Sequence, residues 1–548
     1  MKSRYALYFG LTVILVSVVT CTASFGQDQV RVAVSATSAG NTPVMDLTKG
    51  EFTVQDSGKA QAIATFAGPE TKSPPPPPLK ANEFTNIPDF REASGAVFVV
   101  FDTIDTRYID ESDARSMVLK FLAKAAQAKH AVTLAILSSK GLTVYHDYRE
   151  GSDVLLAALA KSGLGGMKGV APPAGVDDTQ VNAEAARLTA FSKGDLSNAA
   201  AEGQLLHPSI DAVLTMLQDV GWSAAGLPGR KALVWVTNAV PFDMDPKTME
   251  FKSPQITSRG VAVGGETTVG PGVTAGLPGG VAVGGSKDQL TTAEVKRLSP
   301  IWRETVRALF DGGVAVYPYE VRGASNTAAN TLSQIRMKTL ATLTGGKAFF
   351  GSNDPFPELL SISNGNTAGY VLGYAGEAVS NPGFRRVEVM AIRANVEVTH
   401  AAGYFPYEGS VKARLGDETG VAMTSPLEYT GIPFRITVAG MEEGSGGKKK
   451  VNLVIAIPGS AGILNEAAGT VDVGFVANAI NAAGRPVGTM NEGAGGKFNA
   501  EQMAHIKQLG FQLKRSFEVS PGECSVRFVV RDNQSGRMGD VIFPLNVK

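Results

Sequence analysis

Short apolar runs alternate with helical periodicity through the middle of the chain. The runs have no polar face, as in VFVVF at 97–101 and AVTLAIL at 131–137, which predicts strands covered on both sides. Between them, apolar residues recur at helical spacing over 111–129, 205–220, 291–311 and 327–344. Because strands alternate with helices, the pattern predicts an α/β fold, with a doubly wound, mainly parallel sheet over residues 91–380.

The flanks of this region follow a different pattern. Residues 27–70 and 381–548 consist of segments in which apolar and polar residues alternate, separated by turn residues. We expect an N-terminal β unit over 27–70 and a C-terminal β-sandwich over 381–548, with one short helix at 500–508. Alternation does not show which strands pair, and pairing of the N-terminal strands with the C-terminal sandwich would make the α/β domain an insertion in a β framework.

Three stretches are too biased in composition to form a core by themselves. Residues 71–90 contain KSPPPPPLK and are expected to be a stiff, extended linker. Residues 162–204 are rich in Ala, Gly, Ser and Asp, and residues 257–289 contain GVAVGG twice. We expect both to be glycine-rich surface insertions or flexible loops within the α/β domain.

The first residues have the pattern of a secretory signal peptide. Lys2 and Arg4 precede an apolar run that ends near Val19, and small residues follow up to a plausible cleavage point after Gly26. Cys21 could instead be a lipidation site, although VVTC is a poor match to a lipoprotein box. No later window is apolar enough to cross a bilayer. The sequence predicts export of residues 27–548 to the periplasm, the cell envelope or the medium.

Charge and cysteine content exclude several classes of function. Lysine plus arginine equals aspartate plus glutamate at 51 each, so no polycationic surface for nucleic acid is expected. After signal cleavage Cys524 is the only cysteine, which excludes an internal disulfide and a site built from several thiolates. We expect Cys524 to be a small buried hydrophobic residue.

Polar residues gather where the first strand of the α/β region ends. Asp102 closes the run at 97–101, and Thr103, Asp105 and Thr106 follow at once. Ligands of parallel α/β sheets bind at the carboxyl ends of strands. Mg²⁺ prefers oxygen ligands and keeps several waters, so one carboxylate with hydroxyls could hold it. Alternatively, the same side chains cap the turn by bonding backbone amides.

The order of these segments resembles a known family. FDTIDT, GRKALVWVT, GGVAVYPYEVRG, GYVLGYAG and FRRVEVMAIR follow one another as in the VWFA-related Acidobacterial domain family, a bacterial relative of von Willebrand factor type A domains. The resemblance covers most of residues 30–548. It implies a Rossmann-like fold with a metal-ion-dependent adhesion site, at which a carboxylate of a protein partner completes the shell of Mg²⁺ or Mn²⁺.

The resemblance transfers the metal ligands only in part. Asp102 matches the first aspartate of the family's loop, and Thr106 can match its last hydroxyl. Ile104 occupies the middle hydroxyl position and cannot bind a cation, and Asp105 lies close enough to assist.

Two further ligands would come from other loops. Asn238 stands in WVTNAV where the family has an aspartate, and its neutral carbonyl is a weaker ligand for Mg²⁺. Ser209 is the candidate hydroxyl of the second loop. The site is therefore expected to be degenerate.

Signatures of enzymes are weak. The five histidines lack the spacing of zinc motifs, and neither a G-x-S-x-G elbow nor a phosphate-binding P-loop occurs. We predict a non-enzymatic, exported binding or adhesion protein with an unidentified protein partner. Two alternatives remain: a structural or assembly component of the cell envelope without metal dependence, and a hydrolase with an unrecognised site.

Overall fold

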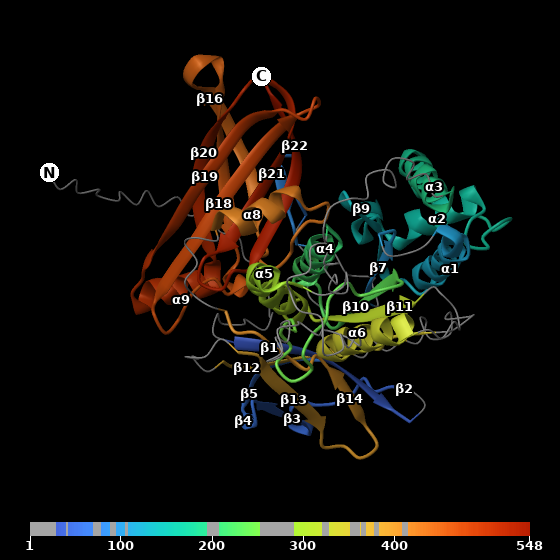
Figure 1. Ribbon diagram of the computed structural model, residues 1–548. Helices are drawn as coiled ribbons and strands as arrows, with labels where there is room; N and C mark the ends of the chain where they lie inside the picture. The colour runs from blue at the N-terminus through green and yellow to red at the C-terminus, as the bar shows by residue number, and fades with distance from the viewer. Residues whose placement is uncertain are drawn as a thin grey trace, which may run out of the picture.

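Antiparallel strand pairing dominates the architecture of this chain (Figure 1). The computed structural model describes residues 29–39, 42–69, 78–87, 95–104, 108–193, 208–252, 290–320, 328–350, 362, 369–376, 383–407 and 415–548. In this part of the chain, four of the five sheets contain only antiparallel pairs and one is mixed. The predicted fold class, a doubly wound, mainly parallel, von Willebrand factor A-like sheet, is therefore wrong for this chain.

The mixed sheet is built from the apolar runs in the middle of the chain. Its strand order is β11-β10-β7-β8-β9, with three parallel pairs and an antiparallel edge strand, β9. The strands are β7 (Ala96–Asp102), β8 (Ala131–Ser138), β9 (Gly141–His146), β10 (Lys231–Thr237) and β11 (Val314–Glu320). Every residue of β7, β10 and β11 is buried, which explains why these runs have no polar face.

Helices cover both faces of the mixed sheet. Phe98 and Val100 of β7 pack on the side of α4, α5 and α6, whereas Val97 and Val99 pack on the side of α1, α2 and α3. The helices are α1 (Tyr108–Gln127), α2 (Ser152–Ser162), α3 (Asp178–Lys193), α4 (Pro208–Ala224), α5 (Thr292–Asp311) and α6 (Ala328–Thr344). The helical periodicity in the sequence predicted α1, α4, α5 and α6, but it did not predict α3.

Helix α3 corrects the prediction that residues 162–204 are a loop. Its residues Val181, Leu188 and Phe191 are buried against the sheet. Because glycine and aspartate residues surround the helix, the composition of the whole stretch did not reveal this apolar face. The other predicted insertion, 257–289, and the predicted signal peptide lie outside the described residues.

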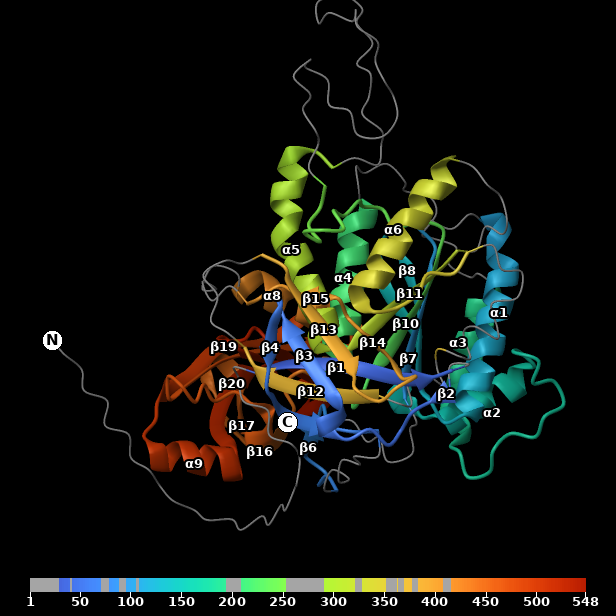
Figure 2. The same cartoon turned by 90° about the horizontal axis from the view of Figure 1, so that it is seen from below.

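The N-terminal strands pair with strands that follow the mixed sheet in the sequence. Strand β1 (Gln29–Ser38) lies between β12 (Gly369–Ala375) and β14 (Glu397–His400). In a second sheet β3 (Phe52–Asp56) pairs with β13 (Arg385–Ala391). Figure 2 shows the blue N-terminal strands beside the yellow and orange ones. The smaller members of the two sheets are β2 (Thr42–Pro43), β4 (Lys59–Gln61), β5 (Ile63–Ala67) and β15 (Gly403–Tyr404).

This pairing changes the predicted domain organisation. Residues 383–404, predicted as part of the C-terminal sandwich, share a core with the N-terminal strands through Val54, Val387 and Val389. Alternation reveals that a segment is a strand, but it does not reveal which strand it pairs with.

Two further antiparallel sheets of four strands enclose one core in the C-terminal part. Val451, Phe475 and Phe528 lie in this core. One sheet contains β6 (Glu83–Thr85), β16 (Arg435–Glu443), β17 (Lys449–Ile457) and β20 (Phe511–Val519). The other contains β18 (Thr470–Asn481), β19 (Pro486–Lys497), β21 (Gly522–Asp532) and β22 (Met538–Val547).

Several details of the C-terminal part bear on the predictions. Helix α9 (Ala500–Leu509) confirms the helix expected at 500–508, and Cys524 is a buried free thiol. Helix α8 (Leu415–Thr424) was not predicted. Strand β6 lies within the predicted linker 71–90, so part of that linker is a strand paired with β16.

Buried polar groups join the two N-terminal sheets to each other and to the mixed sheet. The Asp56 carboxylate is fully buried and accepts hydrogen bonds from the Tyr374 and Tyr404 hydroxyls at 2.9 and 3.0 Å. Its other oxygen accepts from Arg385 Nε at 2.8 Å. Arg230, just before β10, donates to the hydroxyl of Ser35 on β1 at 3.0 Å.

Replacing Asp56 tests this buried network. Asp56→Ala leaves the guanidinium of Arg385 without this carboxylate, and we expect a loss of about 3–5 kcal/mol in the free energy of unfolding. The matched control is Asp153→Ala, because Asp153 pairs with Lys129 at a half-exposed site and should contribute about 1 kcal/mol or less. Urea unfolding followed by circular dichroism measures both. Equal losses in the two variants would contradict the structural role of Asp56.

Candidate functional site

Asp102 lies at the carboxyl edge of the mixed sheet and is fully buried. One carboxylate oxygen accepts a hydrogen bond from the backbone amide of Ile104 at 2.8 Å. The other accepts from the Thr237 hydroxyl at 2.8 Å. Donors from the chain itself therefore reach both oxygens, and the bond to Ile104 is the one expected of a capped turn.

The neighbouring strand β10 ends with Thr237 at the same edge, and Asn238 follows directly. Thr237 is fully buried, and its hydroxyl oxygen also accepts from the amide of Ala239 at 3.2 Å. Asn238 is 2% exposed, and its backbone carbonyl accepts from the Ser333 hydroxyl of α6 at 2.9 Å. These bonds hold the ends of β7 and β10 and the face of α6 together.

The structure brings two of the five predicted ligands to one edge. Asp102 and Asn238 end neighbouring parallel strands, as expected. Asp105 and Thr106 lie outside the described residues, and Ser209 lies in the first turn of α4, where only the backbone is described. Metal binding by this set remains a prediction. Thr237, whose hydroxyl contacts Asp102, was predicted as part of a strand but not as a site residue.

Ile104 has a structural role at this edge. Its side chain is half-buried and packs against the hydrophobic cluster on the α4–α6 side of the sheet. The position that holds a hydroxyl in the resembling family is therefore fixed here by apolar packing.

Thr237→Val tests the importance of the hydroxyl. The change keeps the shape of the side chain but removes the donor to buried Asp102, so we expect a loss of about 1–3 kcal/mol in the free energy of unfolding. Thr237→Ser is the matched control, because it keeps the hydroxyl. Urea denaturation of the three proteins measures the effect. A Val variant as stable as the wild type would show that Asp102 does not depend on this bond.

A second polar cluster lies at the far end of β9, and the sequence did not predict it. His146 Nδ1 lies 2.9 Å from Glu184 Oε1 and 3.3 Å from Glu150 Oε2. Arg187 Nη2 lies 2.6 Å from both Glu150 Oε1 and Glu184 Oε2. The side chains of His146 and Glu184 are buried, whereas those of Glu150 and Arg187 are 34% and 39% exposed. We call these four residues the His146 cluster.

The charges in the His146 cluster influence one another. Burial by itself lowers the pKa of His146, but its contacts with Glu150 and Glu184 outweigh this effect, and the pKa is raised. Burial opposes the ionisation of Glu150, yet His146 and Arg187 bring its pKa down to about 2. The ligand atoms of His146, Glu150 and Glu184 lie within 4.8 Å of one another, which is compatible with a bound metal ion.

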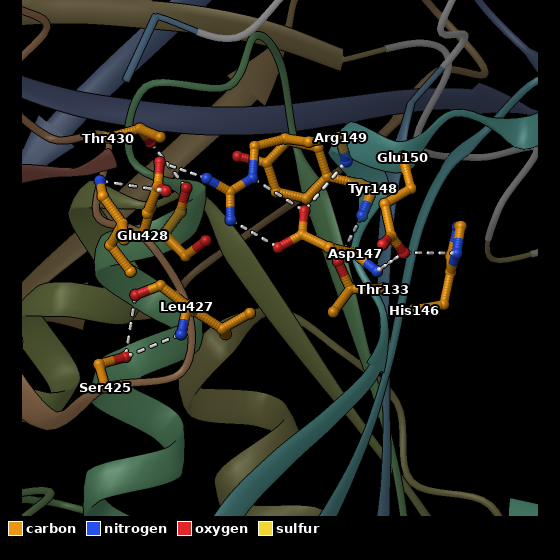
Figure 3. Close-up of polar contacts among 12 residues, drawn as sticks. Thr133, His146, Asp147, Tyr148, Arg149, Glu150, Ser425, Leu427, Glu428 and Thr430 are labelled. Carbon is orange, nitrogen blue, oxygen red and sulfur yellow. Dashed lines mark hydrogen bonds and ion pairs between the residues drawn. The ribbon is translucent and has the colours of Figure 1, made fainter. Parts of the chain in front are cut away.

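The turn that carries Glu150 also connects to the C-terminal part (Figure 3). It is the 3-10 helix η2 (Tyr148–Glu150), capped by Asp147, which accepts from the Arg149 amide at 3.0 Å. Arg149 in turn forms an ion pair with Glu428 in the segment before β16. Burial raises the pKa of Glu428 to about 7, although the charge of Arg149 opposes this rise.

Beyond Glu428, buried charged groups join α4 to β21 and β22. The Tyr429 hydroxyl donates to Asp219 Oδ1 at 2.6 Å, and the Tyr429 amide donates to Asp540 Oδ1 at 2.5 Å. Arg527 Nε donates to Asp540 Oδ2 at 2.7 Å. Burial raises the pKa of Asp219 to about 7, despite the hydrogen bond from Tyr429. We call Asp219, Tyr429, Arg527 and Asp540 the junction network.

The raised pKa of Asp219 predicts a pH-dependent stability. Between its ordinary pKa of 3.8 and about 7, the folded chain keeps a proton that the unfolded chain has lost. The contribution of Asp219 to the free energy of unfolding therefore falls as pH rises through this window, by at most about 1.4 kcal/mol per pH unit, and is constant above it.

Asp219→Asn tests this pH dependence, because the amide does not titrate and its oxygen can still accept from Tyr429. We expect the variant to gain stability relative to the wild type as pH rises from 4.5 to 7. Urea denaturation at half-unit pH steps measures the difference. Asp211→Asn, at an exposed site on the same helix, is the control. A difference that does not change with pH would contradict a raised pKa in the folded state.

Neither the His146 cluster nor the junction network matches a recognisable sequence motif. His146, Glu150 and Glu184 come from a strand, a turn and a helix, and their spacing matches no metal motif. The one available signal was Glu184 itself, which interrupts the apolar face of α3 between Val181 and Leu188.

Comparisons with known proteins give little information on function. No family model matches the chain, and no curated protein matches it. A point mutant of the PilB minor pilin from Streptococcus sanguinis aligns with 13% identity and a TM-score of 0.25 over 50% of this chain. A glycosyl hydrolase family 2 member from Bacteroides cellulosilyticus aligns with 11% identity and a TM-score of 0.15 over 33% of this chain.

These likenesses are too weak to support an argument about fold or activity. The matched region spans 61% of the length of the minor pilin and 20% of the length of the glycosyl hydrolase. The resemblance to the VWFA-related family likewise remains a prediction from sequence motifs.

Proposed function

We propose that this chain is an exported, non-enzymatic binding protein that contacts a protein partner through the loops at the carboxyl edge of the mixed sheet, without a metal ion. The observation that carries the proposal is the internal bonding of Asp102, whose two oxygens accept from Ile104 and Thr237. The edge keeps its shape through these bonds, so a partner meets a preorganised surface.

Burial supports a contact that does not involve a metal. Asp102 and Asn238 are 0% and 2% exposed, so neither side chain reaches a partner directly. Ile104 provides no ligand atom and is anchored by packing. In this proposal the buried polar residues shape the edge, and exposed residues of the segments that follow β8 and β10, such as Lys140 and Lys247, make the contact.

The N-terminal pattern of Lys2, Arg4 and the following apolar run supports export. Among the helices of the described residues, none has the length and the hydropathy to cross a membrane. Retention in the envelope through assembly with other components is the alternative, and the same experiment addresses it.

A binding experiment tests the proposal. Immobilised full-length mature protein is exposed to secreted and envelope proteins of the source cells, and the captured partner is then purified and titrated by biolayer interferometry. We expect the affinity to be the same in EDTA and in Mg²⁺, and to fall at least tenfold in the double variant Lys140→Glu, Lys247→Glu. The control is Lys497→Glu, at an exposed position of β19.

Three outcomes would overturn the proposal. If EDTA abolishes binding and the Asp102→Ala change does the same, the contact depends on a metal ion at the adhesion site. Equal affinity of the wild type and the edge variants would move the contact to another surface. Chelator-insensitive self-association as the sole interaction would favour the assembly role.

A further inference from the structure

We propose that His146, Glu150 and Glu184 form a binding site for one divalent transition-metal ion, with Zn²⁺ preferred. The site is separate from the Asp102 edge of the mixed sheet. His146 lies on β9 in register with Leu134, in the middle of β8, whereas Asp102 lies on β7, on the other side of β8, in register with Leu137. This inference does not rest on the proposed binding function.

The spacing of the donor atoms suits a small metal ion. Tetrahedral ligands at the usual zinc distances of about 2.0–2.1 Å stand about 3.3 Å from one another. His146 Nδ1 already lies 2.9 Å from Glu184 Oε1 and 3.3 Å from Glu150 Oε2. Small adjustments of side-chain torsions would therefore place the three atoms around one ion, with a fourth position open for water.

Three different elements hold the donors. His146 ends β9, and Glu184 projects from the buried face of α3. Glu150 is fixed by the capping of η2, since its Oε2 accepts from the Asp147 amide at 3.2 Å. Because each side chain is positioned by packing or by a backbone bond, little conformational entropy is left to lose on binding.

The chemistry of the donors favours a borderline ion over a hard one. Imidazole nitrogen suits Zn²⁺ and other late transition metals, whereas Mg²⁺ prefers an all-oxygen shell. A neutral His146 with two carboxylates carries a charge of about −2, which a divalent ion would neutralise. Burial of Glu184 at 0% exposure is costly without a cation close by.

Arg187 supplies that cation when no metal is bound. Its Nη2 contacts one oxygen of each carboxylate, and its side chain is 39% exposed. The guanidinium can therefore turn into solvent and release Glu150 and Glu184 to a metal ion. Arg187 and the metal would compete for the same carboxylates, so removing the guanidinium should strengthen metal binding.

Metal titration of the full mature protein, without an affinity tag, tests the site. Zn²⁺ binding is measured by calorimetry, and Co²⁺ is the optical probe, because its visible absorption reports nitrogen and oxygen ligation. We expect one equivalent of each ion to bind. Affinity should fall at least 100-fold in His146→Gln and in Glu184→Gln, rise at least tenfold in Arg187→Ala, and stay unchanged in His505→Gln, an exposed control.

Folding is checked in parallel by circular dichroism. If a change at buried Glu184 prevents folding, Glu150→Gln at the partly exposed position replaces it, with the same expected loss. No saturable binding by either the wild type or Arg187→Ala would overturn the proposal and leave the cluster as an ion-pair network. Binding retained in His146→Gln would place the metal elsewhere and overturn it equally.

Discussion

The pairing of β1 with β12 is the constraint on which the remaining architecture depends. It joins Gln29 to Ala375 in one antiparallel ladder, so the chain between them must leave this sheet and return to it. The mixed sheet and its helices are formed by the chain between these two strands. Loop-closure entropy grows only slowly with length, so the long separation costs little more than a short one. A side chain also connects the N-terminal segment to β12, since the Tyr370 hydroxyl accepts a hydrogen bond from the amide of Leu47, 323 positions away.

Contacts between the parts of the molecule are formed by buried charged and polar groups. Asp56 lies between the two N-terminal sheets, and Arg230 lies where these sheets meet the mixed sheet. Arg527 with Asp540 lies where the C-terminal sheets meet α4. Each of these groups is hydrogen-bonded, because an unpaired buried charge would be strongly destabilising. Hydrophobic cores make each part stable, and the directional polar bonds fix how the parts meet.

The turn at His146–Glu150 shows the same principle on a smaller scale. On one side it contacts α3 through Glu184 and Arg187, and on the other it contacts the segment before β16 through Arg149 and Glu428. A single tight turn thus joins the edge of the mixed sheet to a helix and to the C-terminal part. Capping bonds to the backbone hold the charged residues of this turn in place. The turn therefore positions Glu150 for the proposed metal ion and Arg149 for its ion pair with Glu428.

The sequence alone determined most of the local elements, although it missed α3, α8 and β6. Apolar runs without a polar face predicted β7, β10 and β11, and the helical spacing predicted α5 and α9, because both patterns record how a segment is buried. The sequence also identified the edge of the mixed sheet at which Asp102 and Asn238 lie. Only the tertiary structure decided which strands pair, placed 383–404 with the N-terminus and brought His146 to Glu184. Those outcomes depend on contacts between distant residues, and neither alternation nor spacing along the chain encodes the partner of a contact.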